Sequence, residues 1–334
     1  MGALTQNKKI LFLSDLPLPP FDEGAKVAAK NLCEQLKVAK LGNFEQINGG
    51  LCSLSTIGRL IGCKAGHVLY FPSQSITFNS FLRAKLINLV SRKKIILISC
   101  QPRAYKPWQK RIICKIQPYK IFVQSKELKE SLEKIGLKNV LINAWGVDLE
   151  KFFPVGQEKK NLLRKKYNIP ANQKVYLHFG HLNKDRNFDE LEMVVKAGPN
   201  NYVLIVCSTT TDQKRELKEK LEKKGFHFIV EFVENNQELY QLADYYIFPT
   251  INKTSAIEFP LSVFEALACG IPVFHKNFGA LKDVFDQDYS NLHYYVKPEE
   301  LLNVNFSCRH NFPIYDYSWK KVTVDLLKKI KDKE

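Results

Sequence analysis

The chain has 334 residues, of which 45% are hydrophobic and 25% charged, and its formal net charge is +16. This length exceeds the usual size of a single domain, so we expect two. No stretch reaches the roughly 18 uninterrupted apolar residues that a membrane span requires, which excludes a membrane-spanning class.

Short apolar runs alternate with helical patterns in the first half of the chain. Strands that are apolar on both faces, when separated by helices, predict a parallel sheet covered by helices. A change of composition near Gly146 then precedes a second set of the same kind. The predicted strands are 8–14, 67–72, 94–100, 119–125 and 139–144, then 174–180, 201–207, 227–233, 245–250 and 271–276, and the predicted helices are 24–38, 77–91, 126–136, 186–197, 212–224, 236–243 and 262–269.

The end of the chain predicts one more helix. Trp319, Val322, Leu326 and Ile330 fall on one stripe, with lysines opposite. We therefore expect an α/β protein with one domain in residues 1–155, a second in 156–312, and a C-terminal helix in 313–334 that crosses back to the first domain.

The positive charge is concentrated in the first half of the chain. Residues 1–155 carry 24 basic and 10 acidic residues, a net +14, whereas 156–334 carry 26 and 24, a net +2. Such a field favours a polyanionic partner, and we expect an anionic membrane surface bound through basic residues within 81–120. The alternative is a solvated basic face that aids solubility. Nucleic acid is disfavoured because no recognition motif accompanies the basic residues.

Cysteine usage and the start of the chain bear on location. Eight cysteines occur without a C-x-x-C pair, which is typical of reduced thiols in a cytosolic protein. The apolar run after Lys9 is interrupted at Asp15, too early for a signal peptide. We expect a cytoplasmic protein that can bind peripherally at the inner face of the membrane.

Two carboxylates lie in an otherwise apolar stretch, IEFPLSVFEALACGIPVF. Pro260 can begin a helix but not continue one, so Glu258 is predicted in the preceding loop and Glu265 inside the helix. The N-terminus of a helix suits a diphosphate. Ser262 and Glu265 also have the spacing of a capping box, and this structural interpretation stays open beside a binding role.

Four segments resemble the group 1 glycosyltransferases, a nucleotide-sugar-dependent family with the GT-B fold. In chain order they are ILFLSDLPLPPFDEGAKVAAKNLCEQL, FVQSKELKESLEKIGLKNVLINAWGVDLEKFFP, KVYLHFGHLNKDRNFDEL and YQLADYYIFPTINKTSAIEFPLSVFEALACGIPVFHKNFGALKDV. The resemblance implies two doubly wound Rossmann-like domains that face each other across a cleft. It implies acceptor binding on the first domain and nucleotide-sugar binding on the second.

The resemblance also implies roles for residues of the last segment. Glu265 would bind the ribose diol, and Leu261 and Ser262 would lie at the helix start that receives the diphosphate. The family has two glutamates eight positions apart, and the first aligns with Ile257. Glu258 therefore stands one position late, and we expect a shifted loop to bring it to the transferred sugar; a solvent-facing loop acid is the alternative.

Further residues are expected at the diphosphate. The family usually supplies an arginine and, five residues later, a lysine, and the matching positions here are His181 and Arg186. Lys184 is expected to compensate for the weaker cation His181. Gly24 matches the glycine loop that approaches the donor phosphates. For Arg186 and His181 the alternative is a polar surface loop.

The predicted activity is a retaining, metal-independent transfer of a sugar from a UDP- or GDP-sugar to a hydroxyl of a glycan, lipid or lipid-linked acceptor. No cofactor and no metal ligands are expected, because no histidine pair has ligand spacing and no Asp-x-Asp occurs. Two alternatives are a non-catalytic partner subunit of the same fold, with a basic domain that binds a membrane or polyanion, and an epimerase or phosphorylase.

Overall fold

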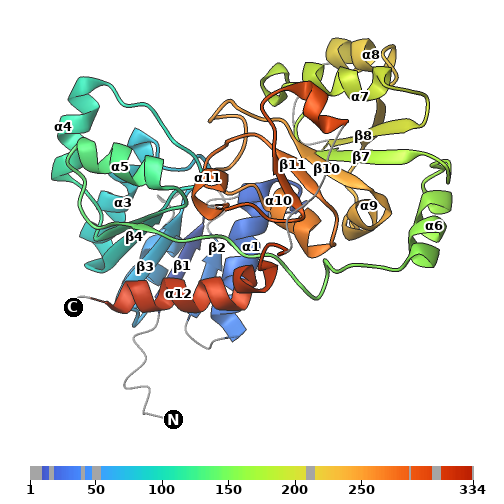
Figure 1. Ribbon diagram of the computed structural model, residues 1–334. Coiled ribbons are helices and arrows are strands. Elements are labelled where there is room, and N and C mark those ends of the chain that lie inside the picture. Colours follow the sequence, from blue (N-terminus) through green and yellow to red (C-terminus); the bar gives the residue numbers. More distant parts are fainter. Residues whose placement is uncertain are drawn as a thin grey trace. The chain divides into compact units, whose positions relative to one another are not determined.

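A computed structural model describes residues 10–14, 19–38, 42–46, 54–207, 215–285, 287–302 and 310–332. The chain divides into two compact units. The first unit contains residues 1–145, 257–259 and 319–334, and the second contains 146–256 and 260–318. Each unit is built on one six-stranded parallel sheet (Figure 1).

The sheet of the first unit has the order β2-β1-β3-β4-β5-β6. Its four central strands β1, β3, β4 and β5 are buried at every residue except Lys94, because helices cover both faces, as the apolar runs predict. The strands are β1 (Ile10–Ser14), β2 (Gly42–Gln46), β3 (His67–Phe71), β4 (Lys94–Ile98), β5 (Lys120–Val123) and β6 (Val140–Ile142). The helices are α1 (Gly24–Val38), α2 (Leu54–Gly62), α3 (Phe78–Ser91), α4 (Pro107–Lys115), α5 (Lys126–Lys134) and α12 (Trp319–Lys331).

The strand order places these helices on two faces. It reverses between β1 and β3, so right-handed crossovers put α1 on one face and α2, α3, α4 and α5 on the other. The C-terminal helix α12 lies beside α1 (Figure 1). Its apolar stripe is buried as predicted, and the buried Lys120 donates from Nζ to the carbonyls of Lys329 (2.6 Å) and Ile330 (2.9 Å). The lysine therefore caps the C-terminal end of α12, where helix carbonyls lack partners.

The sheet of the second unit has the order β12-β11-β10-β7-β8-β9. Its strands are β7 (Lys174–Phe179), β8 (Asn201–Cys207), β9 (His227–Val230), β10 (Tyr245–Phe248), β11 (Val273–His275) and β12 (Leu292–Tyr294). The α-helices are α6 (Gln157–Lys166), α7 (Glu192–Lys196), α8 (Arg215–Glu222), α9 (Gln237–Leu242), α10 (Leu261–Ala268) and α11 (Leu281–Val284). The 3-10 turns are η1 (Lys184–Arg186), η2 (Phe188–Leu191), η3 (Pro298–Leu301) and η4 (Ile314–Tyr317).

The single helix predicted for 186–197 is wrong. Asn187 has a left-handed backbone with φ of 59° and separates η1 from η2, so only Glu192–Lys196 forms α-helix. The other predicted helices lie within a few residues of their observed bounds, although residues 212–214 of the predicted helix 212–224 lie outside the described residues, as do residues 8 and 9 of the first predicted strand.

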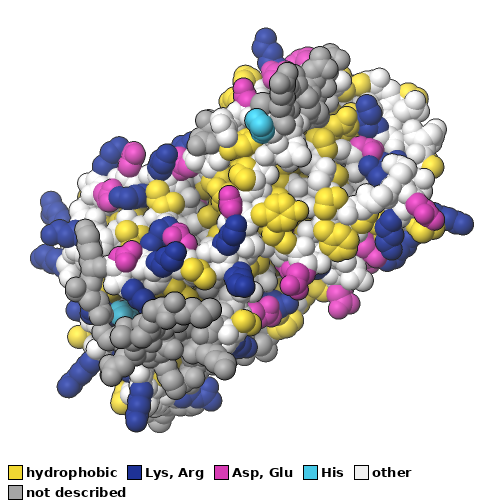
Figure 2. Space-filling model, turned by 60° about the horizontal axis from the view of Figure 1, so that its bottom comes forward, with side chains coloured by type: hydrophobic (Ala, Val, Ile, Leu, Met, Phe, Trp, Pro, Cys, Tyr) yellow, Lys and Arg dark blue, Asp and Glu magenta, His cyan; other side chains and the backbone are white. Residues whose placement is uncertain are grey.

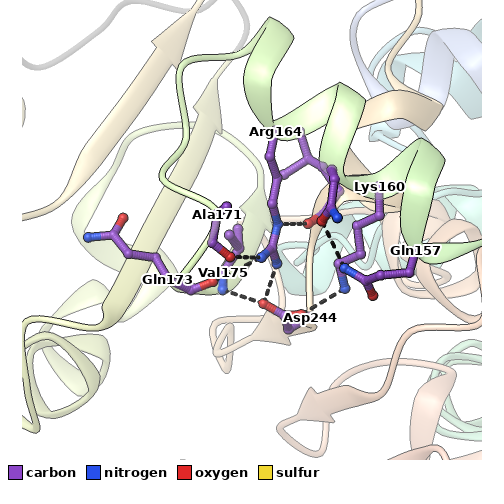
Figure 3. A network of polar contacts seen from close by, with 9 residues as sticks. Gln157, Lys160, Arg164, Ala171, Gln173, Val175 and Asp244 are labelled. Atoms are coloured by element: carbon purple, nitrogen blue, oxygen red, sulfur yellow. Dashed lines mark hydrogen bonds and ion pairs between the residues drawn. The ribbon is translucent and has the colours of Figure 1, made fainter.

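A buried polar network joins α6 to the amino ends of β7 and β10 (Figure 3). The Arg164 guanidinium donates to the carbonyls of Leu242, Ala171 and Gln173 and, at 2.6 Å, to Oδ2 of Asp244. Asp244 Oδ2 also accepts the backbone N–H of Val175 at 2.7 Å, and its Oδ1 accepts Lys160 Nζ at 2.7 Å. Because the partners are backbone groups and an ion pair, this network holds the fold together at the edge opposite the strand carboxyl ends.

Candidate active site

The strand order of the second unit defines where a ligand would bind. The order reverses between the neighbouring strands β7 and β10. Open α/β sheets bind ligands outside the carboxyl ends of their strands at such a reversal. Here β7 ends at Phe179 and is followed by Gly180, β10 ends at Phe248, and α10 begins at Leu261.

Helix α10 begins where the proline predicts. Pro260 is its N-cap, and its carbonyl accepts the N–H of Val263 at 3.1 Å. Glu258 therefore precedes the helix and Glu265 lies within it. The capping-box alternative is wrong, because Ser262 is the second residue of the helix and not its N-cap. Leu261 and Ser262 thus occupy the first turn, where backbone N–H groups lack helical partners.

Aromatic rings from β7, α9 and β10 pack against one another. Phe179 stacks on Tyr240 with 4.8 Å between ring centroids, and Tyr240 lies 5.7 Å from Tyr246. Burial raises the pKa of the Tyr246 hydroxyl above its usual range. This buried hydroxyl has no hydrogen-bond partner within the described residues.

Glu265 lies one turn into α10 against these rings. Its Oε2 accepts a 2.7 Å hydrogen bond from the Tyr240 hydroxyl. Burial raises the pKa of Glu265 to about 7, against the lowering effects of that hydrogen bond and of Lys151, and Asp148 adds to the rise. The carboxyl group therefore titrates near neutral pH, which is unusual for a glutamate and is found at functional sites.

Arg186 is the buried cation of the site. Its side chain belongs to η1 and is only 5% exposed. A Cβ added at Gly180 would lie 2.9 Å from its Nη1, so the guanidinium lies directly beside the end of β7. Its Nε has no hydrogen-bond partner within the described ranges. Burial lowers the pKa of Arg186 to about 10, which leaves the group charged at neutral pH.

The other two predicted cations lie on the same loop. His181 is partly exposed, and its carbonyl accepts the N–H of Asn183 at 3.0 Å. Lys184 is exposed at the start of η1. The loop therefore carries three basic side chains of decreasing burial from Arg186 to Lys184.

His178 is a site residue that sequence reasoning did not assign. It is fully buried in β7, and its Nδ1 lies 2.8 Å from the carbonyl oxygen of Ile247. Burial, with the nearby Arg186 charge, lowers the pKa of His178 to about 3, so the ring is neutral and Nδ1–H donates. Its Nε2 is left as an acceptor 2.8 Å from the position of a Cβ on Gly180, and has no partner within the described part of the chain. The only signal in the sequence is its place two residues before Gly180.

Two predicted site residues belong to the first unit. Gly24 opens α1, and a Cβ there would lie 2.9 Å from Cδ1 of Ile257. Glu258 is 5% exposed; its Oε2 accepts Ser125 Oγ at 2.9 Å and its N–H donates to the Cys100 carbonyl at 2.8 Å. The Glu258 side chain is thus engaged by the start of α5, where Ser125 is also the N-cap.

The described residues contain no group of three or more His, Cys, Asp or Glu side chains placed to hold a metal ion. None of the described helices is long and apolar enough to cross a membrane.

Part of the chain is similar to a known protein family. Residues 159–303 match the family described as Glycosyl transferases group 1. The processive diacylglycerol beta-glucosyltransferase of Staphylococcus epidermidis is 20% identical over 70% of this chain and 68% of its own length. The alpha-galactosylglucosyldiacylglycerol synthase of Streptococcus pneumoniae is 24% identical over 43% of this chain and 39% of its own length, so the alignment leaves much of that relative uncovered.

Solved structures match along nearly the whole chain. Anabaena Alr3699/HepE in complex with UDP has a TM-score of 0.73 at 14% identity, covering 97% of this chain and all (100%) of that one. A glycosyltransferase from Rickettsia africae has a TM-score of 0.74 at 14% identity, covering 98% of this chain and 100% of that one. These likenesses confirm the predicted fold, an α/β protein of the GT-B type with two Rossmann-like domains. The predicted enzyme class is confirmed by the family match of residues 159–303 and by relatives named as glycosyltransferases.

Proposed function

We propose that this chain, which carries a group 1 glycosyltransferase domain in residues 159–303, moves a sugar from a UDP- or GDP-sugar to a hydroxyl of a glycan, lipid or lipid-linked acceptor. The proposal for the nucleotide-sugar donor rests on the polar groups that lie together at the carboxyl ends of β7 and β10. These ends bring together the buried Arg186 guanidinium, the first turn of α10 and the Glu265 carboxyl group, whose pKa is raised to about 7.

Each part of this group suits one part of a nucleotide-sugar. The first turn of α10 and the Arg186 guanidinium favour the diphosphate, because backbone N–H groups and a guanidinium fork bind phosphate oxygens. Glu265 suits a ribose diol, whose two hydroxyl donors need acceptors. HepE of Anabaena was solved with UDP and with UDP-glucose, which supports a uridine donor here.

The remaining predicted residues have narrower roles in the proposal. Lys184 would add positive charge near the diphosphate, and His181 would act there as a pH-dependent cation or as a neutral hydrogen-bond donor. Gly24 would let α1 approach the donor phosphates. Glu258, whose Oε2 accepts a hydrogen bond from Ser125 at the start of α5, would contact the transferred sugar.

The proposal for the acceptor rests on the positive charge of the first half of the chain and on the names of the relatives. The basic first half, net +14, favours an anionic or membrane-borne acceptor. Two relatives have names that specify diacylglycerol or a glycosylated diacylglycerol, which supports a lipid acceptor. We propose attraction to an anionic membrane through basic residues within 81–120, and a location in the cytoplasm at the inner face of the membrane.

The chemistry proposed is leaving-group stabilisation without a metal. Positive charge placed where the departing diphosphate develops negative charge lowers the barrier, and Arg186 with the α10 start would supply it. We propose that the anomeric configuration is retained through attack from the face that the diphosphate leaves, which requires mainly leaving-group stabilisation and orientation. The relatives' names include both beta and alpha products, so the anomer formed should be determined directly by NMR. Activity that persists in EDTA would support a reaction without a metal.

Titration calorimetry with UDP-, GDP- and ADP-glucose tests the donor site. Saturable binding that is lost in Glu265→Gln and retained in Glu216→Gln, an exposed glutamate of α8, is expected. No binding of any nucleotide would overturn the proposal in favour of a non-catalytic subunit. Release of sugar phosphate or an epimerised nucleotide-sugar without acceptor would instead indicate a phosphorylase or epimerase.

A further inference from the structure

Helix α3 exposes leucine to solvent. Its buried side carries Ser80, Phe81, Ala84 and Ile87, while Leu82, Leu86 and Leu89 are 41%, 45% and 63% exposed. The three leucines have the spacing i, i+4 and i+7, so they form one stripe along the outer face. A helix that is apolar on both sides is ordinarily covered on both sides.

The stripe continues onto α4. Phe78, one turn before Leu82, meets Trp108 edge to face with 5.2 Å between ring centroids. Trp108 is 50% exposed, and Ile112, one turn further along α4, is 36% exposed. We call Leu82, Leu86, Leu89, Trp108 and Ile112 the α3–α4 apolar strip.

Only positive charge flanks this strip along the chain. Residues 47–126 contain no Asp or Glu. Figure 2 shows one face of the molecule, on which Asp and Glu side chains lie among the Lys and Arg side chains. The exposed basic residues on and beside α3 and α4 are Arg83, Arg92, Lys106, Lys110, Arg111 and Lys115.

We propose that the α3–α4 apolar strip inserts into the interface of an anionic lipid bilayer, with the flanking basic residues on the lipid phosphates. Leucine and tryptophan on one side with Lys and Arg around them is the pattern of interfacial helices. Charge complementarity selects the partner, because a basic rim around an apolar centre matches a surface that is anionic outside and apolar beneath. The inference rests on the proposed function for its lipid acceptor.

Tryptophan fluorescence gives a direct test, because the three tryptophans differ in exposure. Trp145 is 2% and Trp319 is 5% exposed, so only Trp108 can change its environment on docking. The full chain is mixed with phosphatidylcholine vesicles with and without phosphatidylglycerol. A blue shift with the anionic vesicles only is expected, and it should vanish in Trp108→Phe while flotation with vesicles is only weakened.

Two double variants separate the apolar and charged contributions. Arg111→Glu with Lys115→Glu, exposed on α4 beside Trp108 and Ile112, removes two cations and should lower partitioning by roughly 30-fold or more. Lys220→Glu with Lys223→Glu, exposed at α8 of the second unit, makes the same change in net charge and should leave partitioning within about twofold of wild type. Leu86→Gln with Leu89→Gln keeps the charge and should lower partitioning about tenfold, with the fluorescence shift lost.

Three results would contradict the membrane proposal. Equal loss in the α8 variant, or vesicle binding without a Trp108 shift, would overturn the proposal, as would a Trp108 shift on adding a soluble polyanion such as heparin. UDP-glucose titration of the same variants distinguishes the two proposals. If only the membrane proposal is wrong, UDP-glucose still binds although Trp108 does not shift. If only the donor-site proposal is wrong, Trp108 still shifts with anionic vesicles although UDP-glucose does not bind.

Discussion

Two arginines of the second unit are buried to the same extent at opposite edges of one sheet, and their surroundings differ. Arg164 is 4% and Arg186 is 5% exposed. At the amino edge, every nitrogen of the Arg164 guanidinium donates to a carbonyl or to Asp244 (Figure 3). At the carboxyl edge, Arg186 Nε lacks a partner within the described part of the chain, and burial lowers the pKa of Arg186 to about 10.

The difference separates a cation whose donors are all used by the protein from one with a donor left over, which is what the proposed diphosphate role of Arg186 requires. A buried charge whose donors are all satisfied by the protein has nothing left to offer an anion, and losing it leaves its partners unsatisfied. A buried charge with unused donors costs folding free energy and regains it when an anion binds. The two edges should therefore respond to mutation in opposite ways.

The largest expected effect is on stability, at Arg164. Arg164→Met leaves three carbonyls without their donor and Asp244 with fewer partners, and should lower the free energy of unfolding by about 3–5 kcal/mol. Far-UV circular dichroism in urea measures it. Tryptophan emission serves as an internal control, because Trp108, Trp145 and Trp319 all belong to the first unit. A loss below about 1 kcal/mol would contradict the structural role.

The second expected effect is on donor affinity, at Arg186. Arg186→Met should weaken UDP binding by about 2–3 kcal/mol, the range of charge-assisted hydrogen bonds, measured by calorimetry. Unlike Arg164→Met it should not lower stability, since an under-satisfied buried charge is removed. The comparison of the two edges would fail if Arg186→Met destabilised the protein as strongly as Arg164→Met.

Gly180 tests how closely the carboxyl edge is packed. A Cβ at this position would lie 2.8 Å from His178 Nε2 and 2.9 Å from Arg186 Nη1, too close for either to stay in place. Gly180→Ala should therefore cost about 1–3 kcal/mol, divided between stability and UDP affinity. Gly58→Ala on α2, where nothing lies within 4 Å of the added Cβ, should instead raise stability slightly. If Gly180→Ala had the stability and UDP affinity of the wild type, the loop after β7 would move without cost and the close packing would be contradicted.

The fold could largely be predicted because buried parallel strands are apolar on both faces. Elements that bury little gave no such signal. Helix α6 buries only Leu163 and Arg164, and α4 buries only Ile113, so their sequences look like polar connections. The strand β12 has three residues and none of them is fully buried.

The candidate site was predictable only where local chemistry decides. Pro260 determines where α10 begins, and this places Glu265 in the helix. The sequence could not show that Glu258 would be engaged by Ser125, since that contact joins residues 133 positions apart. Nor could it show that His178 and Arg186 converge on Gly180, because both depend on how the loop after β7 folds back.

Per pH unit, the smallest expected effect is the pH dependence that Glu265 should impose on donor binding. Burial raises its pKa from an ordinary 4.5 to about 7, so the folded protein without ligand binds more protons than the unfolded chain between these values. Its stability should then fall as pH rises through this window.

UDP-glucose affinity should change in the opposite direction, rising by up to about tenfold per pH unit below 7 and levelling above, because only the ionised carboxylate accepts from both ribose hydroxyls. UDP-glucose is the ligand of choice because its diphosphate does not titrate there. Glu265→Gln should remove the slope; a slope that persists in this variant would assign the titration to another group.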